Sequence, residues 1–535
     1  GGNSFLAARL MAALGRRFRD LPRALPAFLE NPTVEHLARL IEKNREEKAR
    51  ERSKLSLFQQ MKLWRSERKR LDAAWEAGMA PGGMRAFIIL WIGQLVSGFG
   101  TGLGAFSLGV WTFDQNFSAT QYAMVGLAAM LAGMLMTPVA GSVADRFDRR
   151  MVILFGDSCA ACMTLLMAVL LYFHLLRVWH VYPIAILMTA FSALQGPAFA
   201  VSISALVPRR QLVRASAMSG LIGTVTGMST PLLAGALVPK IGYHGVILID
   251  FCTFLVGAAT LLSVRFPASA QPVRQPGEKR SVLGDLAFGW SYLRLRPGLL
   301  SLLVLFALTN FSAGIVQSLL LPLIRSFAST TELGTVQSSA AFGALLGSLA
   351  LSAWGGPPPG WRVWGIFVCM IVQGSLLFLG GVQPSVPLVA CALFLAMFTG
   401  PIVGGSSQAI WMTKIGLDVQ GRIFGIRGLI GSSTIPLAYL LAGPLADRVF
   451  GPLLMPHGPL ADSVGRLVGV GPGRGIGLLF VVLGLFINLV VILSFFNPRL
   501  RKVEEELPDV VRNLAGGGGA AAPPAAPAGA EGRAA

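Results

Sequence analysis

From residue 84 onward, the chain alternates between long apolar stretches and short polar turns. Each stretch is long enough to cross the roughly 30 Å hydrocarbon layer of a membrane as a helix. The pattern predicts twelve membrane-spanning helices, at residues 86–111, 122–142, 150–175, 181–206, 212–238, 244–264, 298–324, 332–354, 362–382, 386–411, 425–448 and 474–496. A polar stretch at residues 266–297 divides them six and six. We therefore expect an all-α, polytopic membrane protein built from two six-helix halves.

The composition supports a membrane protein. Of 535 residues, 53% are hydrophobic and 13% are charged, against about 25% charged in soluble domains. The net charge of +19 could indicate a nucleic-acid partner, but the basic residues gather in the N-terminal region and in the loops. With the N-terminus inside, inner loops hold sixteen Lys and Arg residues and outer loops hold six. Because basic loops stay cytoplasmic, we expect a multi-pass protein of the cytoplasmic (inner) membrane with both termini cytoplasmic, and no nucleic-acid partner.

Five cysteines lie inside the apolar stretches. Cys159 and Cys162 have the spacing of a metal or redox pair, but no second pair or nearby His completes such a site. Small residues that pack between helices explain them better. We expect neither a metal site nor a disulfide framework.

A charged turn at residues 141–150 separates the second and third expected spans. Its sequence, G-S-V-A-D-R-F-D-R-R, must lie at a water interface because it joins two membrane-length segments. It resembles G-x-x-x-D-R-x-[GD]-R-R, the loop between helices 2 and 3 of the major facilitator superfamily. The resemblance implies the twelve-helix fold of these transporters and alternating access between its two halves.

In this family the turn closes the inner face. The resemblance implies gating roles for Gly141, Asp145, Arg146, Arg149 and Arg150. Asp145 would pair with basic side chains and with the start of the eleventh helix. The alternative, that the arginines only fix the topology, leaves Asp145 unexplained. At the corresponding place in the second half the chain reads W-G-G-P-P-P-G-W-R, with no Asp, so we expect an asymmetric latch carried by the first half.

Further similarities narrow the family. In the fifth expected span, Gly223, Gly227, Pro231 and Gly235 recur every four residues and loosely resemble the fifth-helix signature of proton-coupled drug antiporters. Ordinary small-residue packing is the alternative. The segments at residues 420–424, 443–448 and 471–475 resemble the macrolide-efflux and enterobactin-exporter branch. The sequence contains no Gly-x-x-x-x-Gly-Lys-Ser/Thr motif, so we expect no ATP hydrolysis by this chain.

Polar residues inside the spans are the candidates for transport. Asp250 is interpreted as the only carboxylate well inside an apolar stretch, where a charge is costly. We expect it to take part in proton coupling, with a structural hydrogen bond as the alternative. Uncharged polar residues fall on single faces of spans that line the central cavity in this family. The candidate substrate contacts are Gln94, Ser97, Thr101, Ser192, Gln195, Asn310 and Gln317.

The first forty residues have a different character. They contain G-G-N-S-F-L and F-L-E-N-P-T-V-E-H-L-A-R-L-I, an order that resembles the second half of a peptidyl or acyl carrier domain. The resemblance implies a 4′-phosphopantetheine cofactor on Ser4, at a helix N-terminus that favours the phosphodiester. Ser4 as a simple helix cap is the alternative. The family's first helix would precede Gly1, so we expect half a domain, from a parent chain that ended a nonribosomal peptide or polyketide assembly line.

We therefore expect six segments along the chain. They are a partial carrier domain (1–43), a charged helical linker (44–83), the first transporter half (84–265), a central cytoplasmic loop (266–297), the second half (298–500) and a disordered tail (501–535).

The expected function is transport and not enzyme catalysis. We expect secondary active export, by proton antiport, of a hydrophobic or amphiphilic small molecule such as a drug, a siderophore or the assembly-line product. The expected partners are this molecule, protons, the lipid bilayer and upstream assembly-line modules, and we expect the transporter to be monomeric. The alternative is a membrane-anchored carrier protein that holds biosynthetic intermediates on Ser4.

Overall fold

The computed structural model describes residues 83–207, 211–264, 282–416 and 419–506. The chain divides into two units, Gly1–Met79 and Ala80–Ala535, and every described residue belongs to the second. The expected carrier segment with Ser4 and its phosphopantetheine, the linker, and the tail beyond residue 506 lie outside the described residues. They remain predictions.

Five continuous helices make the six spans of the first half. They are α5 (Gly83–Asn116), α6 (Ala119–Arg146), α7 (Arg149–Tyr172), α8 (Val178–Leu206) and α9 (Leu212–Ser263). Within α9, Gly242 has φ 72° and ψ 171°, a non-helical conformation that glycine adopts without steric cost. Pro239, just before it, lacks the N–H that a continuing helix needs. The chain bends at this point, and α9 therefore contains the fifth and sixth expected spans.

Six further spans form the second half. They are α11 (Pro297–Arg325), α12 (Thr330–Trp354), α13 (Arg362–Val382), α14 (Val386–Lys414), α15 (Gln420–Pro444) with its π-helical continuation η3 (Leu445–Phe450), and α18 (Arg474–Phe495). Short helices flank them: α10 (Val282–Arg294), α16 (Gly451–Leu453), α17 (Gly465–Val468), α19 (Pro498–Arg501) and α20 (Val503–Glu506). Among the described residues, 11 helices are long and apolar enough to cross a membrane. Since α9 supplies two spans, the all-helical fold with twelve spans is confirmed.

Two connecting segments differ from the prediction. The polar stretch before the second half contains α10, whose Leu293 is fully buried against that half. The tail expected from residue 501 begins instead with α20, where Val503 is buried and the Glu504 carboxylate accepts a hydrogen bond from the N–H of Arg362 over 3.1 Å. Both helices are too short to span a membrane. Contacts with neighbouring helices stabilise them. A search for long apolar stretches therefore misses them.

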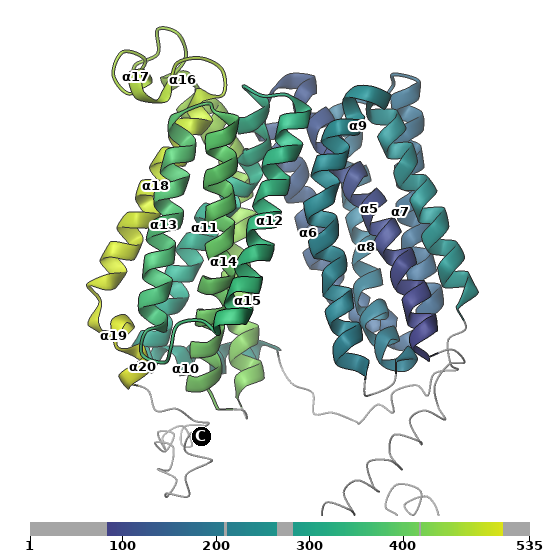
Figure 1. Cartoon of the computed structure of the whole chain (residues 1–535), viewed down its shortest axis with the longest axis horizontal. Helices are drawn as coiled ribbons and strands as arrows, with labels where there is room; N and C mark the ends of the chain where they lie inside the picture. Colours follow the sequence, from purple (N-terminus) through teal and green to yellow (C-terminus); the bar gives the residue numbers. More distant parts are fainter. Residues whose placement is uncertain (1–82, 208–210, 265–281, 417–418, 507–535) are drawn as a thin grey trace, which may run out of the picture. The chain divides into compact units, whose positions relative to one another are not determined.

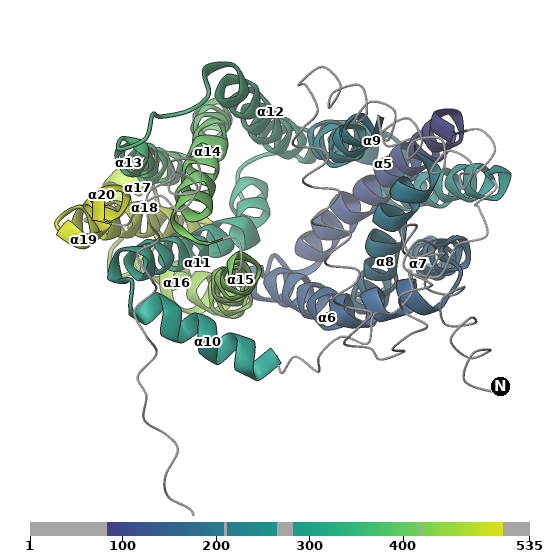
Figure 2. The ribbon, with the colours of Figure 1, turned by 90° about the horizontal axis from the view of Figure 1, so that it is seen from below.

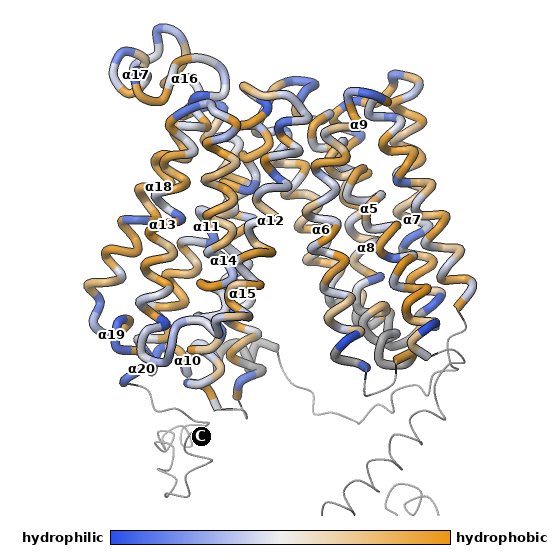
Figure 3. The backbone as a smooth tube through the Cα atoms, viewed as in Figure 1, coloured by the Kyte–Doolittle hydropathy of each residue, from blue (hydrophilic) through white to orange (hydrophobic). Residues whose placement is uncertain are grey.

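Apolar residues cover the outward faces of the spans, and polar residues gather at both helix ends (Figure 3). Large side chains such as Leu135, Tyr172 and Leu493 are 61–74% exposed. A soluble protein rarely exposes an apolar surface of this extent. In a membrane this surface contacts lipid tails, which are as apolar as the side chains themselves.

The two halves contact each other near the end of the bundle that carries α16, here called the α16 end (Figure 1). At this end α9 lies beside α12, and α6 lies beside α15 (Figure 2). The backbones of α9 and α12 approach so closely that a Cβ on Gly235 would lie 2.8 Å from the Thr330 carbonyl oxygen. The ribbons of the halves diverge toward the opposite end, here called the α10 end. The described membrane domain begins and finishes at the α10 end.

Candidate functional site

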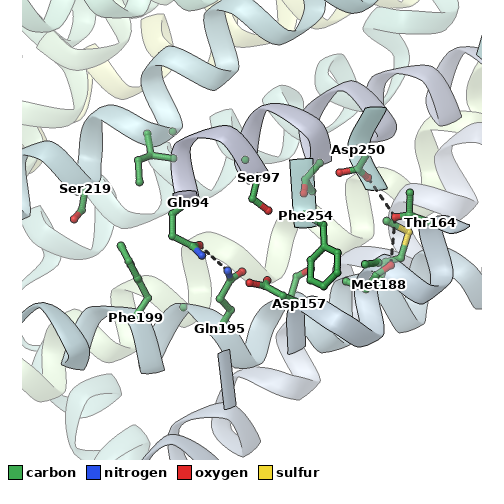
Figure 4. Close-up of a pocket in the computed structure, with 18 residues that line it drawn as sticks. Gln94, Ser97, Asp157, Thr164, Met188, Gln195, Phe199, Ser219, Asp250 and Phe254 are labelled. Atoms are coloured by element: carbon green, nitrogen blue, oxygen red, sulfur yellow. Dashed lines mark hydrogen bonds between the residues drawn. The ribbon is translucent and has the colours of Figure 1, made fainter. Parts of the chain in front are cut away.

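A cavity of about 410 Å³ lies inside the first half, enclosed by α5, α7, α8 and α9 (Figure 4). Its volume is typical of small-molecule binding sites. Aromatic and aliphatic side chains share the lining with polar ones. The lining includes six residues singled out from the sequence: Gln94, Ser97, Thr101, Ser192, Gln195 and Asp250. The fold thus brings residues of distant segments together at one site.

The polar residues of α5 reach the cavity because of their helical spacing. Gln94, Ser97 and Thr101 follow one another at intervals of three and four residues, which places them on one helix face. Gln195 approaches the same place from α8, and its Nε2 donates a hydrogen bond to Oε1 of Gln94 over 2.7 Å. The two hydrogen-bonded amides form a polar part of the cavity lining between α5 and α8.

Asp250 is deeply buried in the cavity wall, with only 5% of its surface exposed. Thr164 of α7 donates a hydrogen bond from Oγ1 to its Oδ2 over 3.2 Å, and the Thr101 hydroxyl lies close to the same carboxylate. The backbone of α5 comes so close that a Cβ on Gly104 would lie 2.8 Å from Oδ2. Hydroxyl groups therefore hold this carboxylate in place, and no basic side chain pairs with it within the described part of the chain.

A second carboxylate, Asp157, lines the same cavity. The sequence-based interpretation of Asp250 as the only carboxylate well inside a span was therefore wrong. Asp157 lies on α7, seven residues before Thr164, so two helical turns bring both to the same face. Its carboxylate lies close to the Gln94 amide, whose buried Nε2 has no hydrogen-bond partner among the described residues. The signal was visible in the sequence, because Asp157 interrupts an otherwise apolar stretch.

The two carboxylates lie at different depths. Asp157 is eight residues from the start of α7, about 12 Å from the α10 end along the helix axis. Asp250 is thirteen residues from the last residue of α9, about 20 Å from the same end. The cavity lining contains no Lys or Arg. The site therefore offers two acidic groups, at two levels, without an internal counter-charge.

The other two candidate contacts lie elsewhere. Asn310 lines a separate cavity in the second half, where its Nδ2 donates to the carbonyl oxygen of Gly431 over 3.3 Å. Gln317 is exposed on α11 and belongs to neither cavity. Helical spacing identified these two polar positions of α11. It did not show which cavity, if any, each side chain lines.

The expected gating residues lie at the α10 end. Gly141, Asp145 and Arg146 belong to the last turns of α6 and Arg149 begins α7, but their side chains are outside the description. Arg150 donates a hydrogen bond from Nη2 to the carbonyl oxygen of Leu262 in α9 over 2.5 Å. This bond links the charged turn to the end of the sixth span. The gating roles remain predictions.

The glycines of the fifth span do not share one role. Gly235 packs against α12, as small-residue packing requires, whereas an added Cβ on Gly223 or Gly227 would meet nothing within 4 Å. Gly223 instead lines the first-half cavity. Packing alone therefore does not explain the repeated glycines.

Gly100 tests whether the close contact between α5 and α9 holds Asp250 in place. A Cβ at this position would lie 2.9 Å from Cα of Asp250, a backbone atom that cannot rotate aside. We expect Gly100→Ala to force the helices apart, at a cost of about 1–3 kcal/mol, and to lower the unfolding temperature of the purified protein. Gly196→Ala is the matched control, because an added Cβ there meets nothing within 4 Å. Equal unfolding temperatures of the two variants would contradict this packing.

Two polar contacts join the halves at the α16 end. The first is an ion pair between Asp114 of α5 and Arg325 of α11, with 2.9 Å between Oδ1 and Nη2. Tyr243 of α9 donates its hydroxyl to Asp114 over 2.8 Å. Arg325 also donates from Nη1 to the carbonyl oxygen of Ala328 over 2.8 Å. The pair is therefore fixed from both sides of the interface.

The second contact is a helix cap supplied by the opposite half. Asp447 of η3 accepts hydrogen bonds from the Ser118 hydroxyl over 3.0 Å and from the N–H groups of Ala119 and Thr120 over 3.3 and 2.8 Å. The first N–H groups of a helix have no partner within it and form the positive end of the helix dipole. The carboxylate of Asp447 satisfies them and ties the end of α15 to the start of α6.

The helices of this pair end in the same six-residue pattern. α6 ends with G-S-V-A-D-R at residues 141–146, and α15 with η3 contains G-P-L-A-D-R at residues 443–448. The end of α15 contacts the start of α6, so the helices run in opposite directions and their two Asp residues lie at opposite ends. The counterpart of the charged turn was expected near residue 355, and the repeat at residues 443–448 was not recognised from the sequence.

Comparisons with known proteins agree with this architecture. Residues 90–439 match the family model of the Major Facilitator Superfamily. The chain is 25% identical over 370 residues to macrolide efflux protein A of Streptococcus pyogenes, covering 68% of this chain and 90% of that protein. It is 20% identical over 424 residues to the multidrug efflux pump Tap of Mycolicibacterium fortuitum, covering 78% and 97%.

Solved structures support the fold. The nucleoside transporter NupG superposes with a TM-score of 0.58 at 14% identity, covering 77% of this chain and 99% of that one. A bacterial homologue of the human lysosomal transporter Spinster, in an inward-facing and unoccupied conformation, gives 0.55 at 15% identity and covers 78% and 98%. The family match includes most of both six-helix halves. The chain belongs to the Major Facilitator Superfamily and is a multi-pass membrane transporter.

Proposed function

We propose that this transporter is a secondary active exporter of amphiphilic cations that exchanges its substrate for protons. The observation that carries the proposal is the pair Asp157 and Asp250, two carboxylates in one cavity whose lining holds no basic residue. Ionisable groups inside membrane spans are costly, and they mark substrate and proton pathways.

The cavity lining favours a cationic amphiphile. Carboxylates attract a positive charge, while Phe199, Phe254 and Met188 provide apolar contacts for the rest of the molecule. The relatives named above are a macrolide efflux protein and a multidrug efflux pump, which supports the same class of substrate. Export of such molecules needs little hydrogen-bond specificity.

Competition for the carboxylates would supply the coupling. A carboxylate can bind a proton or pair with a cation, but not both. Binding of the cationic substrate therefore favours release of the proton, and binding of a proton favours release of the substrate. If each carboxylate becomes accessible to opposite sides of the membrane in turn, the two fluxes are linked. Proton entry would then drive substrate exit.

The contacts at the α16 end would provide the alternation. The excess of basic residues in the loops at the α10 end favours a cytoplasmic location for that end, in the inner membrane of a cell. The ion pair of Asp114 and the cap formed by Asp447 would then close the outer face. When the inner face closes instead, Asp145 is suited to cap the start of α15, since its helix end repeats the pattern around Asp447. Only one of these closures would form at a time.

Dye retention in cells tests the proposal. Cells that express the full chain should retain less ethidium, a permanent cation, than cells without it, because the exporter expels the dye against its gradient. A protonophore should abolish this difference by removing the proton gradient. Equal retention with and without the transporter, or a difference that survives the protonophore, would contradict proton-coupled cation export.

A further inference from the structure

A second cavity, of about 420 Å³, lies inside the other half of the transporter, among α11, α14 and α15. Its lining is apolar and aromatic, with Phe306, Trp411 and Phe424, and includes the polar side chains of Asn310, Gln408 and Ser432. One charged residue, Arg427, also lines it. The two cavities therefore carry opposite charges.

Arg427 lies inside a span and not in a loop. It is one of the sixteen basic residues assigned to the inner loops from the sequence, and that assignment was wrong for Arg427, because it is the eighth residue of α15. Its side chain is half-buried and turns toward α14. Nη1 donates to Oε1 of Gln408 over 2.7 Å, and Nη2 lies 3.3 Å from Oγ of Ser407. Two neutral groups thus position the guanidinium.

Aromatic rings complete this environment. The guanidinium carbon of Arg427 lies 5.1 Å from the centre of the Trp411 ring and 6.0 Å from that of Phe424. Contacts of this kind stabilise a cation by about 0.5–2 kcal/mol but do not neutralise it. Trp411 is itself almost fully buried, so its neighbours hold the ring that contacts the guanidinium in place.

The charge of Arg427 has no counter-charge in this part of the protein. Arginine stays protonated at any physiological pH. The lining residues of the cavity include no Asp or Glu, and the ion pairs found within the described ranges join Asp114 to Arg325 and Glu504 to Arg362. A guanidinium has five N–H donors, and at most two are used here. The remaining donors can bind a ligand.

We propose that the second-half cavity binds an organic anion, whose carboxylate or phosphate pairs with Arg427 and whose apolar or aromatic body rests against Phe306 and Phe424. Paired N–H groups of a guanidinium match the geometry of these anions. The site is separate from the acidic cavity and does not require that cavity to bind cations. Its ligand can be a dissolved anion or the headgroup of an anionic lipid, which share this chemistry.

Binding of 1-naphthoate tests the proposal on the full-length protein in phosphatidylcholine nanodiscs. Its ring should quench the fluorescence of the buried Trp411, and isothermal titration calorimetry gives the affinity. We expect Arg427→Gln to weaken binding on the order of tenfold to a hundredfold, since a hydrogen-bonded charge is lost. Arg427→Lys should retain part of the affinity because it keeps the charge but not the paired geometry.

Three controls make the result specific. Arg466→Gln removes an exposed arginine of the α16–α17 segment and should leave naphthoate binding unchanged. The neutral analogue 1-naphthamide should bind at least about tenfold more weakly than naphthoate. Asp157→Asn should not alter naphthoate affinity, whatever it does to transport. Equal binding of naphthoate by Arg427→Gln and wild type, or equal binding of the amide, would overturn the proposal.

Nanodiscs of phosphatidylglycerol distinguish the two sources of the anion. If a lipid headgroup occupies the site, naphthoate binding to the wild type should be lost in this anionic lipid. If the site serves dissolved anions, binding should persist in both lipids. Either outcome places an anion on Arg427, provided that Arg427→Gln remains defective in phosphatidylcholine.

Discussion

Replacing Asp157 and Asp250 together by Asn is expected to abolish proton-coupled export while leaving the transporter folded. Asn has nearly the same shape as Asp, and its side-chain oxygen can still accept the hydrogen bond that Thr164 donates to residue 250. Under the proposed mechanism, the variant loses the ability to exchange a proton for a cation. Neither side chain pairs with a basic residue in the described structure, so no buried charge is left without its partner.

Proton release on substrate binding measures this effect directly. Purified wild-type transporter in weakly buffered solution should acidify the medium when ethidium is added, and the double variant should not. Each single variant should bind ethidium about tenfold more weakly or worse, because a charge-assisted contact is removed. Asp462→Asn, in an exposed loop near α17, is the matched control and should behave as wild type. Proton release that survives in the double variant would refute the role of this cavity.

Removing the cap and the ion pair at the α16 end is expected to open that end of the transporter. Asp447→Ala takes away the carboxylate that holds the first N–H groups of α6, and loss of a helix cap costs about 1 kcal/mol. That energy changes the ratio of closed to open states by about fivefold. Arg325→Gln breaks the neighbouring ion pair, so the double variant should shift the equilibrium further.

Spin labels at Phe117 and Met455 can report this opening. Both residues are exposed and lie around the space between the halves at the α16 end. Electron paramagnetic resonance distances should lengthen in Asp447→Ala and lengthen more in the double variant. Asp447→Asn should have a smaller effect, because its amide oxygen still accepts hydrogen bonds. Unchanged distances in the double variant would show that these contacts do not control closure.

The sequence predicted the membrane spans well because the signal is long and repetitive. Each span needs about 20 apolar residues, and a polar turn marks each end. The bend inside α9 was also foreseen as a boundary, although the hydrogen-bond pattern continues across Gly242. The short helices α10 and α20 were missed because they depend on burial of residues such as Leu293 and Val503, not on a local pattern.

The candidate site was only partly predictable. Helical spacing placed Gln94, Ser97 and Thr101 on one face, and the structure puts that face on a cavity. Spacing along one helix cannot tell which helix packs against it. The same reasoning therefore did not show that Asn310 lines a different cavity from the first-half residues. The cap formed by Asp447 joins residues 327 or more positions apart, and no local pattern reveals such a contact.

Transport into vesicles can show whether the acidic cavity of the first half couples export to protons. The measurement uses proteoliposomes that contain the full chain, with an acidic interior and ethidium outside. We expect protons leaving the vesicles to drive ethidium inward in the wild type, and no accumulation without the gradient or in the Asp157→Asn, Asp250→Asn double variant. Accumulation that is independent of the pH gradient, or equal in the double variant and wild type, would contradict it.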